Sequence, residues 1–394
     1  MKHGWDYKKL GELVQVLNGY AFKSSLYENQ GIRVLRITNV QKGNIVDDDP
    51  KYYPLSLTDE IRNYLLKESD LLMSLTGNVG RVGLLTKEML PAALNQRVAC
   101  LRILSNGLNL GFLFHYLNSD KFEQDAVLSA KGIAQKNMST EWLKDYKLPL
   151  PPISVQQSIV SELDKINELI RLKKEQLKDY DNLAQSIFYE MFGDPVVNEK
   201  GWEVKKLIET VVLECTISYG IVQPGDGVED GIPVVRPIDL TGTFVSTNNL
   251  KKTTEKIASS YSRTILTGKE LLVCVRGTTG VCSLVTDELK GCNVTRGITP
   301  LLFNDNTDRW FMYYQFQMPQ IKCIIADYTK GITLKQINMA DFRKIPVILP
   351  PLPLQQLFAQ RIELIEKQKA EIQSTIADLE TLLASRMQYW FFGF

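Results

Sequence analysis

The chain has 394 residues, of which 44% are hydrophobic and 23% charged, an ordinary globular composition in a chain longer than one average domain. Its formal net charge of +1 gives no bulk signal for a polyanionic partner, so any such site must be a local face. No apolar run approaches the roughly eighteen residues that span a membrane, and the first residues lack a signal-peptide core. We therefore expect a cytoplasmic protein without a membrane partner.

The first globular segment covers residues 1–147, and a second segment at 194–346 repeats its elements in the same order. An apolar strand in the first part of each segment contains a basic residue, Arg36 in the first segment and Arg236 in the second. Short helices are expected next at residues 55–66 and 254–266, and later strands at 97–104 and 296–303. This internal repeat indicates two related halves.

A strand, a glycine loop and a second strand form the clearest shared unit. The loop glycines are Gly77 and Gly80 in the first segment and Gly277 and Gly280 in the second. Glycine adopts positive φ without steric cost, so the spacing predicts a tight β-hairpin. No Gly-x-Gly-x-x-Gly or Gly-Lys-Ser/Thr pattern follows, which argues against a nucleotide-phosphate loop. Many short strands with few helices predict an α+β domain with a twisted, mainly antiparallel sheet.

Each globular segment is followed by a long stretch, at residues 148–193 and 347–394, that lacks proline and glycine for about thirty residues after its glutamine pair. Both stretches open with a proline pair and a glutamine pair, which recur 199 residues later: Pro151, Pro152, Gln156 and Gln157, then Pro350, Pro351, Gln355 and Gln356. Proline disfavours helix for the residue before it, so a helix should begin here in both copies.

Apolar residues in both stretches recur at alternating steps of three and four, which is the a/d seam of a coiled coil. The expected coiled-coil and partner interface consists of Ile159, Leu163, Ile166, Ile170, Leu177 and Tyr180 with Ile362, Ile365, Ile372, Ile376, Leu379 and Leu383. Two ordinary amphipathic core helices are the alternative. The shared entry at a constant offset favours a helix paired with its own repeat.

Two globular segments, each followed by Pro-Pro-x-x-x-Gln-Gln and a long helix, resemble the specificity subunit of a type I restriction–modification system. The resemblance covers the whole chain and includes the Phe-Gly ends of both helices, Phe192-Gly193 and Phe392-Gly393. It implies two similar target-recognition domains that each read one half of a split target in double-stranded DNA. The domains would be separated by the two helices, packed as an antiparallel coiled coil with pseudo-twofold symmetry. Matched depths would then place Lys173 near Ile376 and Lys369 near Tyr180, with both ammonium groups reaching water.

The resemblance also implies partners. Two methyltransferase subunits and ATP-dependent restriction subunits would assemble on this chain, and S-adenosylmethionine, ATP and Mg²⁺ would bind to those subunits rather than here. The near-neutral charge fits DNA binding only if the partners supply much of the phosphate contact.

The candidate DNA contacts lie in the glycine loops, in the basic loops and on the strand arginines. They are Arg36, Thr76, Asn78, Arg81, Lys131, Gln135 and Lys136 in the first segment and Arg236, Arg276, Thr278, Thr279, Lys330 and Lys335 in the second. The alternatives are plain hairpin turns, solvated loops and, for the two strand arginines, structural pairing.

No catalytic or metal site is expected. The two histidines are His3 and His115, and His115 should pack among neighbouring aromatic side chains. The six cysteines show no Cys-x-x-Cys spacing, which predicts reduced thiols rather than a disulfide or zinc framework. Methyltransferase and nuclease motifs are missing. Two other functions stay open: a coiled-coil scaffold that binds only proteins, and the specificity part of a nuclease or methyltransferase.

Overall fold

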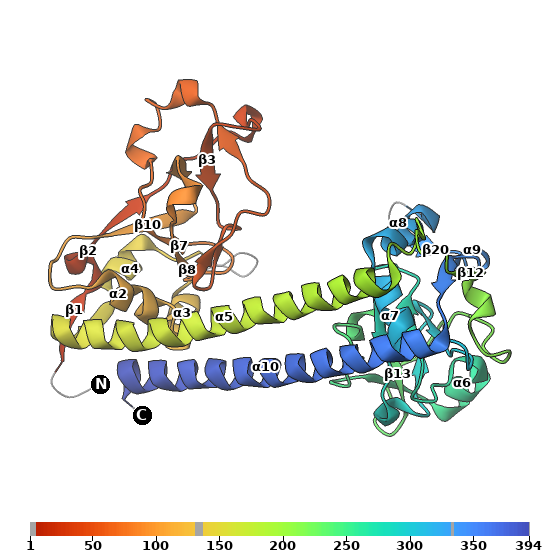
Figure 1. Ribbon diagram of the computed structural model, residues 1–394. Coiled ribbons are helices and arrows are strands. Elements are labelled where there is room, and N and C mark those ends of the chain that lie inside the picture. The colour runs from red at the N-terminus through yellow and green to blue at the C-terminus, as the bar shows by residue number, and fades with distance from the viewer. Residues whose placement is uncertain (1–4, 131–136, 332–334, 394) are drawn as a thin grey trace. The chain divides into compact units, whose positions relative to one another are not determined.

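The structure is a computed structural model that describes residues 5–130, 137–331 and 335–393 (Figure 1). The chain forms two compact units, residues 1–174 with 374–394 and residues 175–373. Two long helices, α5 (Ile153–Phe192) and α10 (Leu352–Phe392), each contribute one part to either unit. Each unit therefore consists of one globular domain and a pair of helix segments.

The domain of the first unit is built from two small sheets and two ribbons. One sheet has the order β2-β10-β7-β8 and is antiparallel; the other has the order β6-β3-β9, in which β3 and β9 are parallel. The strands of these sheets are β2 (Val14–Asn18), β3 (Ile32–Leu35), β6 (Tyr52–Tyr53), β7 (Leu71–Ser74), β8 (Val82–Leu84), β9 (Ala92–Leu94) and β10 (Val98–Ile103). The ribbons pair β1 (Asp6–Lys9) with β11 (Lys147–Leu150) and β4 (Val40–Gln41) with β5 (Asn44–Ile45).

Four short helices complete this domain: α1 (Leu10–Leu13), α2 (Leu110–Leu117), α3 (Asp120–Ser129) and α4 (Thr140–Asp145). One core joins them to the sheet and to the long helices of the unit. Phe112 of α2 is fully buried there with Ile159 and Leu163 of α5, and its ring lies 5.5 Å from that of Phe391 of α10. The globular domain is thus fastened to both helix segments by apolar packing.

The second unit repeats this plan. Its sheets have the orders β16-β15-β18 and β14-β13-β17, with β13 and β17 parallel. Its strands are β12 (Glu203–Lys206), β13 (Ile232–Val235), β14 (Lys251–Thr253), β15 (Leu271–Cys274), β16 (Cys282–Leu284), β17 (Asn293–Val294), β18 (Ile298–Leu301), β19 (Thr329–Lys330), β20 (Gln336–Ile337) and β21 (Pro346–Leu349). Its helices are α6 (Glu255–Ser260), α7 (Arg309–Gln317), α8 (Pro319–Tyr328) and α9 (Met339–Phe342). The α+β class, the two similar domains and the mainly antiparallel sheets are confirmed.

The first glutamine of each pair explains why both long helices begin where they do. Gln156 is completely buried; its Oε1 accepts from the Asn109 backbone N–H at 2.8 Å, and its Nε2 donates to the carbonyls of Gly107 and Pro151 at 2.8 Å. In the second unit, Gln355 makes the equivalent three bonds, to Asp308, Asn306 and Pro350. Asn109 and Asp308 cap α2 and α7, so this glutamine clamp fixes the start of the long helix to the first turn of a domain helix.

Within each unit, the two long-helix segments run antiparallel. In the first unit, Glu162 of α5 accepts from Arg386 and, at 2.9 Å, from Trp390 Nε1, and Lys174 Nζ lies 2.8 Å from Glu380. In the second unit, Lys369 Nζ lies 2.8 Å from Asp181. Eight of the twelve expected seam residues are buried, namely Ile159, Leu163, Ile166, Ile170, Ile362, Ile365, Ile372 and Ile376; the other four are half-buried.

Several local expectations need correction. Residues 55–66 form two short 3₁₀ turns instead of a helix, and residues 148–150 and 347–349 lie in strands β11 and β21, not in the long helices. Arg36 and Arg236 lie directly after strands β3 and β13 rather than within them. Helices α3 and α8 were not predicted. The division at residues 147, 193 and 346 stays a prediction.

Short 3₁₀ turns connect many of these elements, at Ser24–Leu26, Leu55–Leu57, Arg62–Tyr64, Lys87–Met89, Leu207–Glu209, Pro237–Asp239, Ser262–Thr264 and Asp287–Leu289. Lys369 pairs with the residue that follows its predicted neighbour, Tyr180, and its side chain is largely buried, contrary to the expectation that it reaches water. It contacts Asp181 and Glu366, and the lysine side chain is only 12% exposed. None of the described helices is long and apolar enough to cross a membrane.

Candidate nucleic-acid interface

The glycine loop of the first unit is the turn of the β7–β8 hairpin, as predicted. Gly77 and Gly80 have φ of 74° and 84°. A Cβ at Gly80 would lie 2.7 Å from the Ala126 Cβ of α3, so glycine also permits close packing there. The Ser74 hydroxyl donates to the Asn78 carbonyl and holds the loop closed. The Asn78 side chain is exposed at the tip, whereas Thr76 is buried and is poorly placed to touch a ligand.

The chain that follows the first basic loop returns to this glycine loop. The Met138 N–H donates to the Leu75 carbonyl at 2.9 Å, and Asn137 forms a β-bridge with Thr76. Three predicted contacts in the basic loop itself lie outside the described residues: Lys131, Gln135 and Lys136. Asn137 and Met138, about sixty positions further along the chain, thus lie beside the glycine loop.

The second unit brings its own two loops together in the same way. The Gly277 N–H donates to the Lys335 carbonyl at 2.8 Å, and Arg276 forms a bridge with Gln336. Strand pairing sets Lys330 opposite Gln336. Lys330 and Lys335 are exposed, and the half-exposed Arg276 guanidinium has no hydrogen-bond or ion-pair partner among the described residues. Three basic residues of the second unit thus lie on adjoining backbone segments.

Two threonines complete this loop in the second unit. Thr279 accepts from Thr329 between the hydroxyl oxygens at 3.0 Å, which ties the loop to the start of β19. The exposed Thr278 hydroxyl lies 3.5 Å from the Cys274 sulfur. We name the group formed by Arg276, Thr278, Lys330 and Lys335 the basic face of the second unit. Each member carries a polar group that can reach an added ligand.

The predicted strand arginines serve the fold. Arg236 donates from Nε and Nη2 to both carboxylate oxygens of Asp239, at 3.0 and 2.8 Å, and this pairing raises the arginine pKa. In the first unit, Arg36 Nη2 donates to the Asp49 carbonyl at 2.6 Å. Both arginines also open a tight turn, because their N–H groups bond to the side chains of Asp239 and Asn39. Structural pairing is therefore observed, and contact with DNA stays a prediction.

Arg81 is also engaged inside its unit. Its Nη1 donates to Gln41 Oε1 at 2.9 Å, and its Nε lies 3.8 Å from a Glu123 oxygen. Gln41 donates in turn to the Thr38 carbonyl at 2.9 Å, in the turn after β3. Arg81 thus links the glycine loop to that turn and to α3, and it is less free to contact a ligand than Arg276.

A family model described as the type I restriction modification DNA specificity domain matches residues 2–179 and 200–381, one match in each half. The chain belongs to this family. It is similar to the specificity subunit of type I restriction enzyme EcoBI from Escherichia coli, with 24% identity that covers 91% of this chain and 78% of the relative. The putative MjaX specificity subunit of Methanocaldococcus jannaschii is 22% identical and covers 96% of this chain and 92% of its own length.

A solved structure supports the fold of this specificity subunit. The S subunit of a type I restriction–modification system from M. genitalium aligns with a TM-score of 0.56 at 14% identity, covering 99% of this chain and 97% of the other. The protein is a type I DNA specificity subunit with two target-recognition domains, as the resemblance implied.

Two exposed arginines of this specificity subunit were missed as candidates. The Arg97 carbonyl accepts from Leu75 N–H at 3.0 Å, and Arg296 precedes Gly297, whose carbonyl accepts from Val275 N–H at 2.8 Å. Both therefore lie directly beside the glycine loops. The sequence contained a signal for them, because Arg97 and Arg296 lie 199 positions apart, each at the start of one of two equivalent expected strands.

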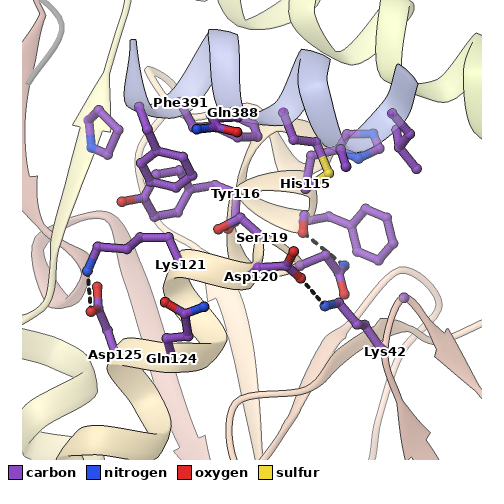
Figure 2. Close-up of a pocket in the computed structure, with 18 of the residues that line it drawn as sticks. Lys42, His115, Tyr116, Ser119, Asp120, Lys121, Gln124, Asp125, Gln388 and Phe391 are labelled. Atoms are coloured by element: carbon purple, nitrogen blue, oxygen red, sulfur yellow. Dashed lines mark hydrogen bonds and ion pairs between the residues drawn. The ribbon is translucent and has the colours of Figure 1, made fainter. Parts of the chain in front are cut away.

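A cavity of about 1040 Å³ opens in the first unit of the specificity subunit between α2, α3 and the last turns of α10 (Figure 2). His115 Nε2 lies 2.7 Å from Asp164 Oδ1, and Lys42 Nζ lies 2.6 Å from Asp120 across the same space. Burial lowers the His115 pKa, although Asp164 acts in the opposite direction. As expected, the His115 ring packs against an aromatic neighbour, Phe114, with centroids 5.3 Å apart. None of the candidate DNA contacts that the structure describes lines this cavity.

Proposed function

We propose that each target-recognition domain reads one half of a bipartite, asymmetric target in double-stranded DNA through its glycine loop and the adjoining segments. One observation carries this proposal. Both units pack the glycine loop against an equivalent returning segment, yet they present different side chains there. The first unit exposes Asn78 and Arg97, and the second exposes the basic face with Arg296. Two similar frames with different polar groups suit two different half-sites.

The chemistry of these groups assigns each a role in recognition. An arginine can donate two bonds to the guanine O6 and N7 edge, and an asparagine can bond to the adenine N6 and N7 edge. We assign Arg276, whose guanidinium has no partner within the described part of the chain, and the exposed Asn78 to base edges on this ground. Lysines act mainly as point charges toward phosphate, which fits Lys330 and Lys335.

We further propose that the long helices bind the partner subunits. Each unit contains an antiparallel pair of helix segments, so two copies of one methyltransferase subunit can find equivalent surfaces. Exposed leucines on these segments are available for such contacts: Leu172 and Leu382 in the first unit, Leu183 and Leu357 in the second. ATP-dependent restriction subunits would join the complex. S-adenosylmethionine, ATP and Mg²⁺ would be held by the partners, and this chain would itself be non-catalytic.

The test is a selection from random DNA duplexes, with the full chain alone and with methyltransferase subunits from the same genome. We expect a two-part sequence with a gap to be enriched. Replacing residues 1–147 with the corresponding domain of another specificity subunit should change one half and leave the other intact. A change in both halves would contradict modular readout. Absence of any enrichment would favour the protein-only scaffold, and methyl transfer from S-adenosylmethionine by the chain alone would contradict a non-catalytic role.

A further inference from the structure

The turn after β13 holds an apolar side chain beside the basic face of the second unit. Within Pro237–Asp239, Ile238 is 72% exposed, although Val235 is completely buried and Asp239 and Leu240 are only 5% exposed. A single exposed aliphatic residue is common on protein surfaces. This one differs because its flanking residues are anchored in the domain while it alone projects outward.

The turn is rigid as well as exposed. The Asp239 N–H donates to the Arg236 carbonyl at 2.9 Å, and the Asp239 carboxylate accepts from the Arg236 backbone and guanidinium. A further bond, from the Leu240 N–H to the Pro237 carbonyl at 3.3 Å, closes the turn. Little conformational entropy remains to be lost when the tip meets a ligand, so its contacts can be specific.

Direct packing joins this turn to the glycine loop. A Cβ at Gly297 would lie 2.7 Å from Pro237 Cγ and 3.6 Å from the Arg276 carbonyl, so Gly297 fits between the turn and the loop. Arg276 in turn bridges to Gln336 next to Lys335. Ile238 is therefore an apolar neighbour of charged and polar groups that are suited to the major groove.

We infer that Ile238 contacts the 5-methyl group of a thymine in the half-site read by the second unit. This inference rests on the proposed function and assigns a specificity role within it. Thymine is the base that presents an apolar group in the major groove, and apolar side chains recognise it there. The equivalent position in the first unit is Thr38, which is exposed on the matching turn and carries a hydroxyl beside its methyl. The two turns thus give the two half-sites different preferences.

The experiment uses the sequence selected by the full chain, with its methyltransferase subunits where these are needed for binding. Each thymine of that duplex is replaced in turn by deoxyuridine, which removes only the methyl group. Wild-type affinity should fall about fourfold at one thymine of one half-site, the effect of returning one methyl group to water. Ile238→Ala should bind the thymine and deoxyuridine duplexes equally well, because the contact is already gone.

Two variants serve as matched controls. Leu213→Ala removes a side chain that is 97% exposed near the opposite end of β18, where Val211 bridges to Phe303, and it should retain the full methyl dependence. Thr38→Ala should alter preference in the other half-site alone. The inference is overturned if Ile238→Ala keeps the methyl dependence, if it weakens all duplexes equally, as a wedge between base steps would, or if no thymine matters. A wild-type chain that enriches no sequence would overturn the proposed function itself.

Discussion

His115 in α2 and Tyr314 in α7 stand 199 positions apart, at equivalent places in the two units, and they meet different partners. His115 faces Asp164 of α5, whereas the Tyr314 hydroxyl donates to Glu366 of α10 at 2.8 Å. The glutamine clamp, in contrast, makes the same three bonds in both units. Side chains that hold the backbone are shared between the units, whereas the contact between this domain helix and a long helix has diverged.

This comparison separates two kinds of residue. Those that hold the backbone form the frame, and those whose polar groups are available to DNA form the readout. The glycine loops keep positive φ at both of their glycines in each unit, because the turn requires it. Arginine, however, occupies different places in the two loops, at Arg81 in one and Arg276 in the other. Changes in the frame should therefore cost stability in whichever unit they are made, while changes in the readout should affect DNA binding in one half-site.

The largest effect is expected from the glutamine clamp. Gln156→Leu leaves the buried Pro151 carbonyl, the Gly107 carbonyl and the Asn109 N–H without their partners, and a group left unpaired away from water costs about 1–3 kcal/mol. The free energy of unfolding of the first unit should fall by about 4 kcal/mol, measured by urea denaturation. Gln157→Leu changes the exposed neighbour and should stay within about 0.5 kcal/mol of wild type. Equal effects of the two variants would contradict the clamp.

A smaller loss is expected at the second glycine of each loop, and here the units should differ. Gly80→Ala places a methyl group 2.7 Å from the Ala126 Cβ, which has no rotamer to move. Gly280→Ala meets the Ile325 Cγ2 at 3.2 Å, which can shift. Both substitutions incur the cost of positive φ, about 1–2 kcal/mol, and Gly80→Ala adds overpacking, for a total of about 3 kcal/mol. The urea midpoint should decrease more for Gly80→Ala than for Gly280→Ala. A larger decrease for Gly280→Ala would contradict this explanation.

The readout should show the reverse pattern, with binding lost and stability kept. Arg276→Ala removes a guanidinium that has no partner among the described residues, and it should weaken binding to the selected duplex by about tenfold, the lower range for a base contact. The melting temperature should not change. Arg81→Ala should instead reduce stability modestly, because it breaks the bonds to Gln41 and Glu123. Relaxed preference at one base pair would identify Arg276 as a base contact, and a uniform loss across sequences would identify a phosphate contact.

The repeat made much of the frame predictable from the sequence. Glycines at fixed spacing predicted the hairpins, and the proline and glutamine pairs marked the starts of both long helices within a few residues. Helix α3 was missed because its sequence is mostly polar and buries only Phe122 and Ala126, which gives too weak a periodic signal. Signals for its start were present, since Ser119 caps it.

Local sequence patterns predicted less of the arrangement of the interface. Arg276 and Gln336 are sixty positions apart, and no periodicity indicates that they form a bridge. The Arg236 side chain turns toward Asp239, three residues later, because that carboxylate accepts from both the backbone N–H and the guanidinium of Arg236. Composition alone cannot tell such an inward pair from a free cation. Burial and hydrogen-bond geometry were needed to separate Arg236 from Arg276.

The smallest expected effect is a pH dependence confined to the first unit. Burial lowers the pKa of His115 below its usual 6.5, so the folded chain binds this proton less readily than the unfolded chain does. The neutral histidine therefore contributes stability above pH 6.5, and that contribution is lost as the pH falls through the folded pKa. Tyr314 does not titrate here, since burial raises its pKa. The hydrogen bond from Arg386 is the main cause that lowers the pKa of Glu162. The contribution of Glu162 to stability is therefore lost only below about pH 4.5.

Stability between pH 7 and 5 should therefore decrease in the first unit more than in the second. Samples are equilibrated in urea at each pH and then labelled by a short deuterium pulse at one fixed pH, so that α2 and α7 report the two units separately. His115→Gln keeps an N–H that can donate to Asp164 but cannot titrate, and it should remove the difference. A slope that persists in α2 of this variant, or one of equal size in α7, would show that another group is responsible. His115 and Tyr314 would then differ in their packing but not in their effect on the pH dependence of stability.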